Sequence, residues 1–125
     1  MSHEALPKLA LTHGNIINIA SMWSFFGSPM SPGYTASKTG IIGLTKSLSN
    51  AWYEHHVRVN AIAPGVILEP PNTEWTTEQK NNIINSVPLG RMGSEKDIAD
   101  AAIFLSEAEY VTGQILNIDG GKSLS

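Results

Sequence analysis

A tyrosine and a lysine stand four residues apart in the run YTASK, as Tyr34 and Lys38. On a helix, positions i and i+4 lie on the same face, so the ammonium would come close to the phenol. A phenol has a reference pKa of about 10, and a neighbouring cation favours its ionised form. The spacing is therefore typical of a proton-transfer pair, but an exposed surface contact between two helical residues has the same spacing.

A serine, Ser21, is a further candidate site residue, because it stands at the carboxyl end of a predicted strand. Ser21 follows the apolar run GNIINIA (14–20), which predicts a strand covered on both faces of a parallel sheet. A second strand, VRVNAIA (57–63), ends at the turn Pro64-Gly65. The carboxyl ends of parallel strands form one rim, where ligands bind, so we expect Ser21 and Pro64-Gly65 to lie together there.

This set of side chains fits proton transfer coupled to hydride transfer at a carbonyl or alcohol carbon. Tyr34 would exchange the proton, and the hydroxyl of Ser21 could donate a hydrogen bond to the substrate oxygen as charge develops on it. No side chain carries a hydride, so the reaction requires a bound hydride carrier.

The helices expected around these strands follow from apolar periodicity and capping signals. Residues 31–56 predict one long helix. Residues 76–85 predict a short helix inside the long irregular segment 66–93. Residues 94–107 begin with a serine N-cap and an aspartate three positions later, an acidic relative of the capping box. The apolar stripe of the long helix is Ile41, Ile42, Leu44, Leu48, Ala51 and Trp52.

A third strand, QILNID, opens after Gly113 and ends at Gly120-Gly121. Strands that alternate with helices in this order predict right-handed parallel crossovers. The chain of 125 residues has the size of a single domain, 1–125.

Composition argues against several kinds of partner. The net charge of −3 comes from 8 basic and 11 acidic residues without runs of one sign, so we expect neither nucleic acid nor a membrane as a partner. There is no cysteine, and the four histidines lack the spacing of a metal cluster, so no metal site is expected. The amino terminus lacks a basic region followed by a long apolar run, which predicts a cytoplasmic protein.

Other conspicuous residues favour structural roles. We expect Asn60 and Asn117 to bind backbone or support turns, His55-His56 to cap the long helix, and Asp119 to end the third strand in a turn. Three aromatic residues after Ser21 could either line a substrate pocket or cover the core: Trp23, Phe25 and Phe26.

Six runs occur along the chain in an order that is specific as a set: GNIINIAS, YTASK, GLTKSLS, VRVNAIAPG, PLGRMGSEKDIADAAIFLS and VTGQILNIDGG. With them the chain resembles the C-terminal half of a short-chain dehydrogenase/reductase. The resemblance implies an α/β fold, a partial Rossmann-like, doubly wound parallel sheet of about three strands without the N-terminal nucleotide-binding half. The ending is similar to 3-oxoacyl-acyl-carrier-protein reductases and to pteridine reductases.

The resemblance also implies roles for individual residues. Tyr34 would be the catalytic acid/base, Lys38 would bind the nicotinamide ribose and favour the ionised form of the tyrosine, and Ser21 would orient the substrate carbonyl. Tyr34, Lys38 and the segment Pro64-Gly65-Val66 would contact the cofactor, which is NAD(P)H in this family. Expected partners are a small carbonyl or alcohol substrate, and either further copies of the chain or a complementary N-terminal half.

Two features depart from the family pattern. Many members carry a threonine shortly after the Pro-Gly turn, where this chain has Ile67-Leu68-Glu69-Pro70. The chain also contains no glycine-rich turn between a strand and a helix, the usual cradle for a pyrophosphate. Cofactor binding by this chain alone is therefore expected to be poor. The alternative function is a catalytically silent member that acts as an oligomerisation or interaction module.

Overall fold

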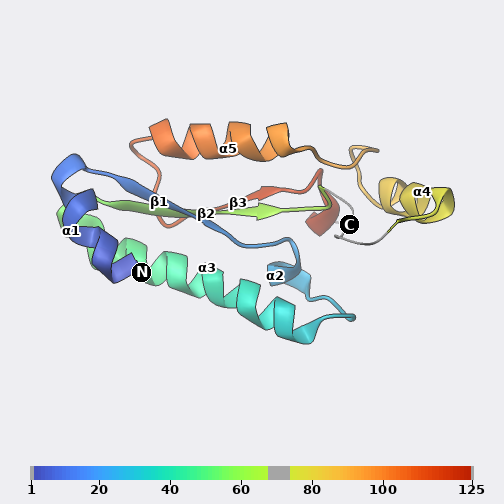
Figure 1. Ribbon diagram of the computed structural model, residues 1–125, viewed down its shortest axis with the longest axis horizontal. Coiled ribbons are helices and arrows are strands. Elements are labelled where there is room, and N and C mark those ends of the chain that lie inside the picture. The colour runs from blue at the N-terminus through green and yellow to red at the C-terminus, as the bar shows by residue number, and fades with distance from the viewer. Residues whose placement is uncertain (1, 68–73, 125) are drawn as a thin grey trace.

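The computed structural model, which describes residues 2–67 and 74–124, is an α/β structure built on a three-stranded parallel sheet. The strands are β1 (Asn15–Ile19), β2 (Arg58–Pro64) and β3 (Ile115–Ile118), in the order β1-β2-β3. Helices α1 (Ser2–Thr12) and α3 (Pro32–Trp52) lie on one face of the sheet, and α5 (Glu95–Glu107) covers the other (Figure 1). The expected architecture is confirmed.

The strand pairing places β2 at the centre. Asn15 of β1 is in register with Arg58, and Ala61 of β2 is in register with Ile115 of β3. Five consecutive residues of β2, 59–63, are buried, whereas β1 is only partly buried. The expectation that this strand is covered on both faces is nevertheless correct, because Ile16 packs on the side of α1 and Ile17 packs on the side of α5. The strand is only partly buried because it lies at the edge of the three described strands.

Small and branched side chains fill the space between the layers. Towards α3 the sheet presents the buried alanines 20, 61 and 63, which pack against Ile41 and Ile42. Towards α5 it presents Ile62, which packs with Ala101 and Leu105. The face of α5 that meets the sheet is apolar, and the sheet therefore has an apolar layer on each side.

The apolar stripe expected for α3 is only partly correct. Leu44 is 43% exposed and Ala51 is exposed, whereas the polar residues Thr45 and Ser49 are buried with Trp52. The helical face that meets the sheet follows positions 41, 45, 49 and 52, roughly one residue in every turn. Hydroxyl groups enter this interface because each forms a hydrogen bond there.

Capping residues set the ends of the helices. The capping box of α5 at Ser94 and Asp97 is confirmed, and α4 (Thr77–Asn85) begins with a second one, made by Thr76 and Gln79. The long helix ends at Trp52, before the 3₁₀ turn η1 (Tyr53–His55), and His56 follows in a left-handed conformation. No helix in 2–67 or 74–124 has the length and apolar character needed to cross a membrane.

Candidate active site at the carboxyl ends of the strands

The carboxyl ends of the three strands form one rim, as expected. The backbone N–H of Ala20 donates to the carbonyl of Ile62 (2.8 Å), and Met22 N–H donates to Pro64 (2.9 Å). Gly65 N–H in turn donates to Ile118 (2.9 Å), so the three chain segments stay together beyond the regular strands. Ser21 therefore lies on the same rim as the Pro64-Gly65 turn.

Ser21 is held in place by the turn that follows it. Its side chain is 5% exposed, and its Oγ accepts a hydrogen bond from the backbone N–H of Trp23 (3.3 Å). A hydroxyl carries one donor and two acceptor lone pairs, so this contact leaves the O–H of Ser21 able to donate.

Tyr34 and Lys38 lie in the first two turns of α3, which Pro32 begins. The Lys38 Nζ atom donates to the carbonyl of Ile19 (2.9 Å) and lies 5.8 Å from the centre of the Tyr34 ring. Tyr34 is 45% exposed. The expected placement of both side chains on one helix face is thus observed, and the lysine also reaches the end of β1.

A short helical turn, α2 (Trp23–Phe26), follows Ser21. It is fastened to the start of α3: Thr39 Oγ1 donates to the carbonyl of Ser24 (3.3 Å), and Ser28 N–H donates to Thr35 Oγ1 (2.9 Å). The rings of Trp23 and Phe26 pack at 4.9 Å. Because Phe25 and Phe26 remain exposed, a role in a substrate pocket stays open beside a role in covering the core.

The turn after β2 is pressed against the turn after β3. A Cβ atom on Gly65 would lie 2.6 Å from the Cα of Asp119, so no other residue fits there without a shift of backbone. The Asp119 carboxylate accepts backbone N–H bonds from Gly121 and Ser123 (2.9 Å each). Burial raises the pKa of Asp119, but the bonds from Ser123 and Gly121 outweigh it and leave the pKa below its usual value. Its expected role as a turn residue is confirmed.

A hollow of about 330 Å³ lies beside this turn. Its walls include Val66, Ile67 and Leu89, with the polar side chains of Arg91 and Asn117. Ser21, Tyr34 and Lys38 do not line it. Val66 in its wall belongs to the segment Pro64-Gly65-Val66, which is expected to contact nicotinamide. Leu68, Glu69 and Pro70, where the sequence departs from the family pattern, lie outside the described residues.

A larger hollow of about 820 Å³ lies at the opposite end of the strands, lined in part by His13, His56 and Arg58. Ligands of parallel sheets bind at the carboxyl ends of the strands, and this hollow lies at the amino ends. Arg58 in this hollow caps the carboxyl end of α5. Its guanidinium donates to the carbonyls of Leu105 and Ser106 (2.7 Å each). We therefore place the candidate active site at the carboxyl rim.

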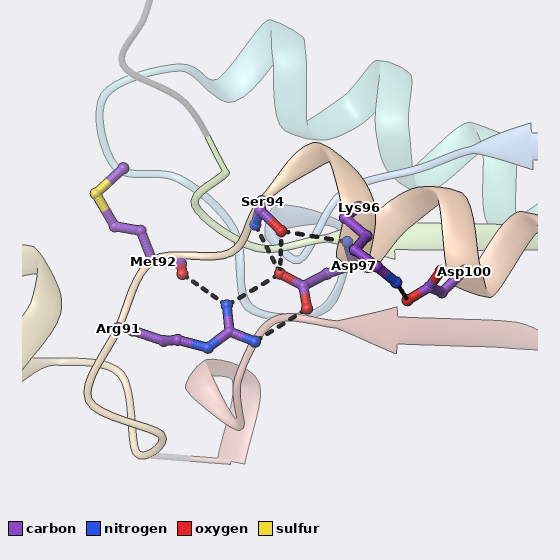
Figure 2. Close-up of polar contacts among 6 residues, drawn as sticks. All are labelled: Arg91, Met92, Ser94, Lys96, Asp97 and Asp100. Carbon is purple, nitrogen blue, oxygen red and sulfur yellow. Dashed lines mark hydrogen bonds and ion pairs between the residues drawn. The ribbon is translucent and has the colours of Figure 1, made fainter.

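An ion pair that the sequence analysis did not identify fixes one wall of the smaller hollow. Figure 2 shows the Arg91 guanidinium binding both carboxylate oxygens of Asp97 (2.9 Å each), while Ser94 donates to the same carboxylate (2.7 Å). The hydrogen bonds from Arg91 and Ser94 hold the pKa of Asp97 well below its usual range. Gly93, between them, donates to the carbonyl of Val66 (3.0 Å), so this loop is tied to the segment after β2.

Asn60 and Asn117 have the structural roles expected of them. Asn60 is fully buried; its amide donates to the carbonyl of Val111 (2.8 Å) and accepts from Gln114 N–H (3.0 Å). Asn117 is exposed and donates to Ser123 Oγ (3.3 Å). The two histidines after α3 are exposed, and the His56 ring lies 5.0 Å from that of His13.

Comparison with known proteins identifies the family. Residues 1–123 match the family model described as Enoyl-(Acyl carrier protein) reductase. The chain is 46% identical over 113 residues to 2-dehydro-3-deoxy-D-gluconate 5-dehydrogenase of Bacillus subtilis, covering 87% of this chain and 44% of the relative. It is 38% identical over 111 residues to the 3-oxoacyl-acyl-carrier-protein reductase of Thermotoga maritima, covering 87% and 45%.

A solved structure from Agrobacterium tumefaciens, described as a 2-deoxy-D-gluconate 3-dehydrogenase with bound NADP, superposes with a TM-score of 0.84 at 45% identity. The match covers 95% of this chain and 51% of that one. The chain thus spans about half the length of the relatives it matches. From the family match and these identities, the chain belongs to the short-chain dehydrogenase/reductase family.

Proposed function

We propose that this chain provides the catalytic half of an NAD(P)-dependent oxidoreductase that interconverts a carbonyl and an alcohol. The observation that carries the proposal is the position of Lys38, whose Nζ binds the carbonyl of Ile19 at 2.9 Å and lies 5.8 Å from the Tyr34 ring. A cation, a phenol and the strand that leads into Ser21 are thereby brought to one rim. The NADP bound by the Agrobacterium relative supports this class of cofactor.

Each of the three side chains has a defined task in this proposal. A bound nicotinamide would supply the hydride. The Tyr34 hydroxyl donates its proton to the substrate oxygen during reduction and recovers it during alcohol oxidation. Ser21 donates a hydrogen bond to the same oxygen as negative charge builds there. The Lys38 ammonium favours the phenolate that remains after Tyr34 has given up its proton.

Lys38 and the segment Pro64-Gly65-Val66 fit the nicotinamide end of the cofactor. An ammonium has three N–H donors, so Lys38 can bind a ribose hydroxyl while it keeps its contact with Ile19. The segment Pro64-Gly65-Val66 offers a wall for the nicotinamide at the same rim. The pyrophosphate has no such counterpart, because the 125 residues contain no glycine-rich strand-turn-helix motif. We therefore propose a complementary N-terminal half as the partner, with a homo-oligomer as the alternative assembly.

A cofactor titration tests this requirement for a second half. NADH and NADPH are titrated, with nicotinamide fluorescence as the signal, against the purified chain and against the chain co-expressed with the N-terminal half of the Bacillus relative. We expect weak binding and no turnover for the chain alone. Only with the added half do we expect oxidation of 2-dehydro-3-deoxy-D-gluconate with NAD(P)⁺, or reduction of a 3-oxoacyl thioester with NAD(P)H. Saturable low-micromolar binding with turnover by the chain alone would show that no second half is needed.

Matched variants test the catalytic roles in the complemented enzyme. Tyr34→Phe removes only a hydroxyl and should abolish turnover without loss of folding. Tyr53→Phe is the control, because Tyr53 is 65% exposed and its hydroxyl binds only Glu54 within the described residues (3.1 Å). Equal turnover by the two variants would refute the role of Tyr34. Lys38→Ala should weaken cofactor binding and lower turnover, because it removes the ammonium donors, whereas the exposed Lys46→Ala should leave both unchanged.

A second function, as an interaction module, is favoured by exposed apolar side chains on α5. Ile103 and Phe104 are 56% and 53% exposed on the helix face that points away from the sheet. Contiguous exposed apolar groups are typical of protein–protein contact surfaces. Stable assembly with the N-terminal half of the Bacillus relative, without turnover of any carbonyl tested, would favour this function over catalysis.

A further inference from the structure

A polar pair, made by the buried Thr45 and the partly buried Asn18, joins α3 to the edge strand β1. The amide of Asn18 donates from Nδ2 to Thr45 Oγ1 (3.0 Å), and the same hydroxyl donates to the carbonyl of Ile41, one turn back in the helix (2.7 Å). Thr45 is completely buried. Its hydroxyl is thus used both as acceptor and as donor, in a layer where an unsatisfied polar group would cost about 1–3 kcal/mol.

Lys38 makes a second contact between the same two elements. Its Nζ binds the carbonyl of Ile19, the residue next to Asn18 on β1. Lys38 and Thr45 are seven positions apart, which is two helical turns and therefore the same face of α3. The Asn18–Thr45 contact lies between the helix and the sheet, and the Lys38 contact lies at the carboxyl rim. Together the two contacts set the position of α3 along β1.

The apolar contacts around the Asn18–Thr45 pair are poorly suited to fixing the position of α3 along β1. Towards the rim, α3 packs against the alanines at positions 20, 61 and 63. Its larger apolar side chains, Leu48 and Trp52, pack against the sheet only towards the other end of the helix. Alanine side chains form a shallow surface, and apolar attraction has no directional preference, so a small slide of the helix changes it little. A hydrogen bond weakens steeply once its geometry is lost. Among the described residues, the Asn18–Thr45 pair supplies a directional contact next to these alanines.

We propose that Asn18 and Thr45 are positioning residues that fix α3 along β1 so that Lys38 reaches the carboxyl rim. The proposal rests on the proposed function only for the importance of Lys38; the placement of Lys38 is a separate, measurable property. A displacement of about 1 Å is enough to impair a catalytic group. The sequence analysis missed both residues, because it assigned the face of α3 by its apolar members alone.

The test compares two substitutions at Thr45 by competitive acetylation of lysines, read by mass spectrometry. Thr45→Val keeps the shape and removes the hydroxyl, whereas Thr45→Ser keeps the hydroxyl and removes a methyl group. The signal is the labelling of Lys38 divided by that of Lys46, an exposed lysine on the same helix. We expect Thr45→Val to raise this ratio roughly two- to tenfold, the range that corresponds to loss of one hydrogen bond, and Thr45→Ser to leave it near the unsubstituted value.

Two further variants guard against a general loss of structure. Ser47→Ala removes an exposed hydroxyl from α3 and should not change the ratio. Asn18→Ala removes the pair from the strand side while Thr45 keeps its bond to Ile41, and it should raise the ratio even if Thr45→Val unfolds the chain. An unchanged ratio in Asn18→Ala, or an equal rise in Thr45→Ser and Thr45→Val, would overturn the proposal. Because no turnover is measured, a failure of the proposed catalytic role would be seen separately, in Tyr34→Phe.

Discussion

Replacement of Asn60 by leucine should destabilise the chain strongly, although Asn60 touches no expected catalytic residue. The side chain is fully buried in β2 and binds two backbone groups of the segment before β3, the carbonyl of Val111 and the N–H of Gln114. Leucine has a similar volume but no polar atoms, so both backbone groups would lose their partner. At about 1–3 kcal/mol for each orphaned group, and allowing for water to reach one of them, we expect a loss of about 2–4 kcal/mol.

Urea unfolding followed by far-ultraviolet circular dichroism measures this loss at a fixed protein concentration. Asn117→Leu is the matched control, because Asn117 is exposed and should change stability by no more than about 0.5 kcal/mol. Amide hydrogen exchange at Gln114 gives a local check and should accelerate only in Asn60→Leu. A loss for Asn60→Leu no larger than that of the control would refute the reasoning, and it would return Asn60 to consideration as a functional residue.

Two further predictions concern pH and assembly. The pKa of Asp97 is lowered by Arg91 and Ser94, so its contribution to stability is present above its ordinary pKa of 3.8 and is lost as pH falls below that value. The unsubstituted chain should therefore lose more stability than Asp97→Asn between about pH 5 and pH 2, measured by urea unfolding; parallel curves would contradict this. The exposed Ile103 and Phe104, with the edge strand β1, predict an oligomer in light scattering at micromolar concentration, and a monodisperse monomer would contradict it.

Several features could be predicted from sequence because their physical cause is local. The Tyr34–Lys38 contact follows from one helical turn of spacing, and the start of α5 follows from a serine followed three positions later by an aspartate. The rim shared by Ser21 and Pro64-Gly65 needed only the rule that parallel strands end on the same side. The motifs quoted for the family resemblance were also sufficient to identify the family.

Other features depended on contacts between residues far apart in the chain. Asn18 and Thr45 are 27 residues apart, and Asn60 binds groups 51 and 54 residues away, so no periodicity within a helix or strand reveals either arrangement. The same holds for Gly65, whose missing side chain makes room for the backbone of Asp119. The sequence by itself determined the three strands, the helices α3, α4 and α5, and the catalytic candidates, because helix and strand periods and capping are local. Only the tertiary structure decided which polar groups are buried and how α3 is fastened to the sheet, because a hydrogen bond in the core depends on where both elements lie.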